Sequence, residues 1–144
     1  MGKILIVNVG PVQSEPEAVA QAVAERLSEY KVSALYACAV PGADGMAQVI
    51  GGRFGLQAQP LPGLGEAMAA ALDDIVVKHK KETAVIISQP ALSVTMVLHL
   101  LGLGSKHYGQ IAQDPGAVNL FEVRFGVPSA LYINDTCHLE NINQ

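Results

Sequence analysis

Two apolar runs in this sequence end where an α/β protein commonly presents a reactive side chain, and both end in inert residues. Residues 83–88 form a β-branched run that leads directly into Gln89 and Pro90. A strand that runs into a helix places the junction residue at the carboxyl edge of a sheet, where ligands bind. A carboxamide at that junction is neither a nucleophile nor a proton donor at neutral pH. The first apolar run ends in the same inert manner, in Asn8 and Val9.

Three other residue types, glutamate, cysteine and histidine, could do chemistry, and each also has an ordinary structural interpretation. Glu66 could donate a proton, although a glutamate that begins a helix is commonly favoured there by the helix dipole. Cys38 could be a nucleophile, but a single cysteine in an apolar run is typical of a small buried hydrophobe. Cys137, His138 and the distant His107 match no zinc-ligand spacing. The sequence therefore predicts neither a metal nor a cofactor.

Composition narrows the class of protein further. Half of the 144 residues are hydrophobic and 15% are charged, which excludes a disordered chain. The formal charge of −4 argues against nucleic acid or an anionic membrane as partner. Only three arginines are present, few for an enzyme that grips phosphate or carboxylate groups. No signal-peptide pattern precedes the first apolar run, so we expect a single cytoplasmic domain over residues 1–144.

The order of predicted elements indicates an α/β fold. Apolar runs predict strands, and 3.6-residue periodicity predicts the helices between them. The expected strands are 3–8, 33–38, a short extended piece at 56–61, 83–88, 117–125 and 129–133, and the expected helices are 15–30, 45–54, 66–81 and 91–103, with a short turn at 106–111. Residues 126–128 are expected to join the last two strands as a hairpin. This alternation predicts a mostly parallel sheet with an antiparallel edge strand.

Three segments of the second half carry a resemblance to a known family. Residues 98–103, 114–123 and 134–139 together resemble the phosphoglycerate mutase-like branch of the histidine phosphatase superfamily. The most specific of them is the closing Asn-Asp-Thr-Cys-His-Leu run at 134–139. The resemblance implies a three-layer α/β/α sandwich. It also implies that Asn134 and His138 tie the last strand to the first helical layer, beside the alternative that they are site residues.

The resemblance implies a phosphate site from which the reactive groups are missing. The family's chemistry needs a histidine that becomes phosphorylated, a second histidine, two arginines and an acid. Asn8 and Val9 stand where the family has its Arg-His pair, Gly42 at the second arginine and Gln89 at the second histidine. Only the acid has a candidate, Glu66. The vestigial pocket implied in this way consists of Asn8, Val9, Gly10, Gly42, Glu66, Gln89 and Pro90.

These observations predict a catalytically inactive phosphatase-like protein that acts as a binding, scaffolding or regulatory module. Two alternatives stay open: an enzyme with rebuilt chemistry that uses Cys38 or His138, and a small-metabolite sensor. We expect an unidentified protein partner or self-association, with the exposed side of residues 67–77 as a candidate surface. The free N–H groups of a helix that begins near Pro90 could also hold a weakly bound anion.

Overall fold

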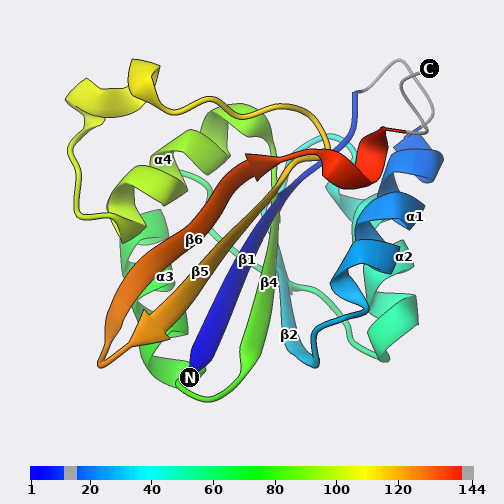
Figure 1. Cartoon of the computed structure of the whole chain (residues 1–144), viewed down its shortest axis with the longest axis horizontal. Helices are drawn as coiled ribbons and strands as arrows, with labels where there is room; N and C mark the ends of the chain where they lie inside the picture. The colour runs from blue at the N-terminus through cyan, green and yellow to red at the C-terminus, as the bar shows by residue number, and fades with distance from the viewer. Residues whose placement is uncertain (12–15, 141–144) are drawn as a thin grey trace.

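A six-stranded sheet runs through the middle of the molecule (Figure 1). The computed structural model describes residues 1–11 and 16–140. The strands are β1 (Gly2–Asn8), β2 (Val32–Ala37), β3 (Gln59–Pro60), β4 (Thr83–Ser88), β5 (Val118–Arg124) and β6 (Val127–Asp135). Their order in the sheet is β3-β2-β4-β1-β5-β6. The first four strands in that order pair in parallel, and β5 pairs antiparallel with β1 and with β6. The predicted α/β class, with antiparallel pairing at one edge, is confirmed.

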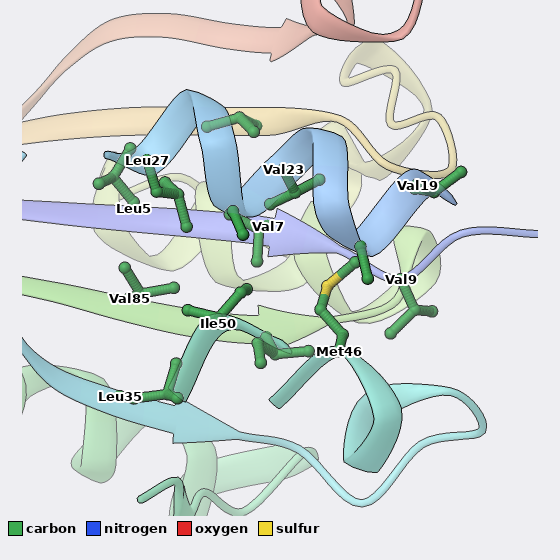
Figure 2. Packing of buried hydrophobic residues seen from close by; sticks show 14 of the residues in the cluster. Leu5, Val7, Val9, Val19, Val23, Leu27, Leu35, Met46, Ile50 and Val85 are labelled. Carbon is green, nitrogen blue, oxygen red and sulfur yellow. The ribbon is translucent and has the colours of Figure 1, made fainter. Parts of the chain in front are cut away.

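Helices cover both faces of the sheet and form the three predicted layers. They are α1 (Pro16–Leu27), α2 (Ala43–Phe54), α3 (Gly65–Lys78) and α4 (Pro90–Leu100), with short 3₁₀ turns η1 (Ser105–Gln110) and η2 (Cys137–Leu139). Figure 1 shows α1 and α2 on one side of the sheet and α3 and α4 on the other. Each pair of helices buries its own apolar cluster against the strands. Figure 2 shows the α1–α2 cluster, in which Val7 and Val9 of the first strand region point toward these helices.

Three helices end earlier than their periodicity predicts, and α3 is one of them, since it ends at Lys78 rather than at residue 81. The expected start of the first helix, at residue 15, lies outside the described residues, and α1 ends at Leu27 rather than at residue 30. Helix α4 ends at Leu100 rather than at residue 103. The cause is Gly102, whose φ of +73° reverses the chain while the Leu103 N–H donates to the Leu98 carbonyl at 2.9 Å. This arrangement is a glycine C-cap, in which an early reversal satisfies the last helical carbonyls.

The hairpin loop at the sheet edge begins one residue earlier than predicted and is one residue shorter. Arg124 pairs with Val127, so the loop consists of Phe125 and Gly126 rather than residues 126–128. Both loop residues have positive φ, +53° and +76°. A two-residue turn of this kind matches the natural twist of the flanking strands. Pro128 therefore lies inside β6, where an edge strand tolerates a residue that has no N–H.

The two neighbouring glycines of α2 have different surroundings. A β-carbon at Gly51 would collide with the carbonyl oxygen of Leu56, whose N–H donates to the Gly51 carbonyl at 2.9 Å. A β-carbon at Gly52 would meet only open space. Gly51 is therefore needed for the close return of the chain after α2, and Gly52 is not. Among the described residues, no helix combines the length and the apolar character needed to cross a membrane.

Candidate functional site

The predicted site positions meet where β1 and β4 end side by side. Asn8 pairs with Ser88 across the two strands, and the Val9 N–H donates to the Ser88 carbonyl at 2.8 Å. The Val9 carbonyl accepts from the Gly116 N–H at 3.1 Å. These bonds place Val9 and Gln89 at the same carboxyl edge of the sheet. The structure thus brings together the ends of the two strands that carry inert residues.

Val9 occupies the centre of this edge as a packing residue. Its side chain is 6% exposed and belongs to the apolar cluster between the sheet, α1 and α2. Figure 2 shows Val9 beside the start of α1, near Val19, and near Met46 of α2. Gly42, the residue before α2, lies against it, because a β-carbon there would be 3.6 Å from the Val9 β-carbon. The aliphatic side chain of Val9 therefore faces the backbone of Gly42, which carries no side chain.

Asn8 points to the opposite face of the sheet, because side chains alternate along a strand. Its carboxamide is fully buried and makes three hydrogen bonds. The Nδ2 group donates to the Gln113 Oε1 at 2.8 Å and to the Asp114 carbonyl at 3.1 Å, and the Oδ1 accepts from the Ser93 hydroxyl. The Gln113 side chain also exchanges hydrogen bonds with Asn119 of β5. Asn8 thus belongs to a buried amide network and does not project into a pocket.

Asn134 extends the same network to the edge strand. Its backbone N–H donates to the Asn119 Oδ1 at 2.9 Å. Its side chain accepts from the Asp114 N–H at 2.8 Å and donates to the Asp114 carboxylate at 2.9 Å. Its φ of +60° is one that asparagine tolerates better than most residues. These contacts give Asn134 a structural role that joins β6 to the loop before β5.

His138 lies in a second polar cluster, on the α1 side of the molecule. Its Nε2 donates to the Gly116 carbonyl at 2.8 Å, and its Nδ1 accepts from the Arg26 guanidinium at 2.9 Å. The same guanidinium binds the Asp135 carboxylate at 2.9 Å, and this contact lowers the pKa of Asp135 to about 2. Burial lowers the pKa of His138, which favours the neutral ring that Arg26 needs as an acceptor. Both ring nitrogens are occupied, so His138 ties the last turn to α1.

The remaining candidates come from different elements: the first turn of α3, the junction between β4 and α4, and the residue after β2. Glu66 is exposed in the first turn of α3, and Gln89 is half-buried at the position before α4, where its carbonyl accepts from the Ser93 N–H at 2.9 Å. Cys38 is 2% exposed, and burial raises the pKa of its thiol. A thiol held protonated in this way is a poor nucleophile. Within the described residues, no group of three histidines, cysteines or carboxylates is placed to hold a metal.

Sequence reasoning missed a pocket beside the strand ends. Its volume is about 390 Å³, and it lies between the start of α1 and the first two turns of α2. Gly10 and Gly42 form part of its wall, and neither Glu66 nor Gln89 is among the residues that line it. The glycines and prolines at 10–11 and 41–45 are the only sequence signal for it, and they also predict ordinary turns.

The fold is that of the histidine phosphatases. No protein-family model and no curated protein matches the sequence. Among solved structures, Entamoeba histolytica phosphoserine phosphatase in complex with 3-phosphoglyceric acid is 18% identical, with a TM-score of 0.79 over 96% of this chain and 100% of that one. Bacillus stearothermophilus YhfR is 14% identical, with a TM-score of 0.84 over 97% and 100%. Shigella flexneri alpha-ribazole phosphatase is 10% identical, with a TM-score of 0.75 over 92% and 96%. The predicted phosphoglycerate mutase-like fold is therefore confirmed.

Proposed function

We propose that this phosphoglycerate mutase-like chain is catalytically silent and acts as a binding, scaffolding or regulatory module. One observation carries the proposal: the strand end that would present a nucleophile presents Val9, packed into the core against Gly42. Phosphoryl transfer through a covalent intermediate needs a nucleophile at that point, and an aliphatic side chain is none. Another protein, or a second copy of this chain, is the binding partner that we consider first.

The surroundings of Val9 support the same conclusion. A transferring phosphoryl group needs cationic donors placed around its oxygens, and loss of one such donor commonly costs about 10²–10³ in rate. Gly42 has no side chain, and the Asn8 amide is consumed on the other face of the sheet. The half-buried Gln89 adds only a neutral amide. A protein that lacks both nucleophile and clamp has no route through the histidine phosphatase mechanism.

The alternative of rebuilt chemistry finds less support than that of a small-metabolite sensor. The Cys38 thiol is buried with a raised pKa, and both ring nitrogens of His138 are engaged in hydrogen bonds. The sensor alternative is favoured by the pocket beside Gly10 and Gly42, since about 390 Å³ suffices for a small molecule.

A turnover assay tests the proposal directly. The purified chain is incubated with p-nitrophenyl phosphate, and release of nitrophenolate is compared with that of the Glu66→Gln variant and of a buffer blank. We expect the same rate in all three, because the carboxyl group of Glu66 has no nucleophile to assist. Turnover above the blank that falls at least about tenfold in the Glu66→Gln variant would contradict the proposal.

A further inference from the structure

The pocket between α1 and α2 has a definite chemical character. Its lining combines apolar side chains, such as Ala20, Met46 and Val49, with one carboxylate, Glu17, and one carboxamide, Gln48. No lysine, arginine or histidine is among the described residues that line it. We infer that this pocket binds a small, largely apolar molecule that carries a protonated amine, and that it discriminates against phosphate esters. The inference rests on the proposed binding function and names its ligand class.

Missing side chains create the space. A β-carbon on Gly45, in the first turns of α2, would have no heavy atom within 4 Å, and one on Gly42 would touch only Val9. The positive φ of Gly42, +87°, strains any other residue at that position. Gly45 has no such requirement, so its lack of a side chain keeps the pocket open without serving the backbone. The volume of about 390 Å³ lies within the usual range for ligand pockets, about 300–1,000 Å³.

Charge selects the ligand class. Glu17 lies in the first turn of α1 and is the only charged residue of the described pocket lining. The positive ends of α1 and α2 both face this region, but each amounts to only about half a positive charge, and the first-turn carboxylates Glu17 and Asp44 outweigh them. The chain as a whole carries a formal charge of −4. An ammonium group near Glu17 is therefore attracted, whereas a phosphate group meets a carboxylate and no cation.

A set of three probes of similar shape tests this selectivity. Phenethylamine, 2-phenylethanol and phenyl phosphate are titrated into the uniformly ¹⁵N-labelled full chain, and amide chemical shifts are followed. We expect the amine to move the amides of Ala20, Gly42 and Gly45, with a dissociation constant on the order of millimolar. It should bind about two- to fivefold more tightly than the alcohol, the gain typical of one partly exposed ion pair. Phenyl phosphate should bind most weakly.

Two pairs of variants locate the site. Glu17→Gln should remove the preference for the amine over the alcohol, whereas Glu25→Gln, an exposed site on the same helix outside the pocket, should keep it. Gly45→Leu should fill the pocket and weaken amine binding at least about tenfold. Gly52→Leu, on the same helix with equally open surroundings, should leave it unchanged. Both leucine variants should fold, because leucine favours a helix more than glycine does.

Several results would overturn the inference. These are tighter binding of phenyl phosphate than of the amine, shifts that cluster away from α1 and α2, indifference to Gly45→Leu, and no shift with any probe up to its solubility limit. None of them restores phosphatase chemistry, so the proposed function would survive each one. Turnover of p-nitrophenyl phosphate, by contrast, would remove the proposed function itself.

Discussion

Replacing Asn8 by alanine tests whether its buried carboxamide stabilises the fold. The substitution removes one fully buried carboxamide and its three hydrogen bonds, to Gln113, Asp114 and Ser93. Each net hydrogen bond contributes about 1 kcal/mol, and partners left buried without a bond add about 1–3 kcal/mol. We therefore expect Asn8→Ala to lower the free energy of unfolding by about 3–4 kcal/mol, a large share of the roughly 5–15 kcal/mol of a typical domain.

Urea unfolding followed by circular dichroism measures this loss. With a slope near 2 kcal/mol per molar urea, the midpoint should fall by about 1.5–2 M. Gln21→Ala removes an exposed carboxamide from α1 and serves as the control, with an expected change within about 0.5 kcal/mol. Ser93→Ala breaks the same hydroxyl contact, so the double variant should lose less than the sum of the single losses, by at least about 0.5 kcal/mol. A loss below about 1 kcal/mol in Asn8→Ala, or strict additivity with Ser93→Ala, would refute a structural role for the amide.

Three further predictions follow from particular contacts. Because Asp135 has a folded pKa of about 2, below the usual value of 3.8, its ion pair should stabilise the protein above about pH 4 and lose that contribution as the pH falls toward 2. Asp135→Asn should therefore lower the free energy of unfolding, measured in urea, by about 1 kcal/mol at pH 6 and leave it unchanged at pH 2. An equal loss at both pH values would contradict this. Gly51→Ala should destabilise the protein, while Gly52→Ala should stabilise it by up to about 1 kcal/mol. Melting temperatures that shift in the same direction in both variants would contradict this. Of the two cysteines, exposed Cys137 should react with Ellman's reagent in the native protein, and buried Cys38 should react only after unfolding. Reaction of two thiols per chain without denaturant would contradict this.

The architecture could be predicted from the sequence because each buried strand is one continuous apolar run. Helices cover both faces of the strands at residues 83–88 and 3–8, so neither strand shows the alternation of a half-exposed strand. Both were predicted with nearly their observed bounds. The ends of elements were predicted less well. Phe125 adopts a positive φ that its residue type does not indicate, and Gly102 stops α4 earlier than its periodicity suggests. Such ends depend on local reversals that compete with a continuing pattern.

The sequence indicated the two strand ends that lie side by side, but not how their side chains are arranged. Asn8 and Val9 are adjacent in the sequence, yet strand alternation sends their side chains to opposite faces of the sheet. The partners of the Asn8 amide near residues 113–114 lie more than a hundred positions away, and no short-range pattern indicates them. The pocket depends on the open space around Gly45, which only the packing of α1 against α2 reveals. Residue types therefore predicted that the strand ends carry unreactive side chains, and packing determines what those side chains contact.

The arrangement of the arginines explains why phosphate chemistry would not return with the histidines alone. Arg26 is bound to Asp135 and His138 on the α1 side. Arg53 lies in the last turn of α2, about 16 Å along the helix from Gly42 at 1.5 Å per residue. Arg124, at the hairpin end of β5, pairs with the Glu122 carboxylate at 2.7 Å. None of the three is placed at the carboxyl ends of β1 and β4.

The double variant Val9→His, Gln89→His should therefore show no turnover of p-nitrophenyl phosphate. It would supply two imidazoles but no guanidinium, and a phosphoryl group that lacks cationic donors loses several orders of magnitude in rate. Adding Gly42→Arg would not complete the clamp, because position 42 holds a φ of +87° that disfavours any side chain. Turnover in the double variant, with the wild-type chain silent beside it, would mean that the carboxyl ends of β1 and β4 can bind phosphate through groups other than those described. The preference for an amine that we infer for the neighbouring pocket would then need a different physical cause.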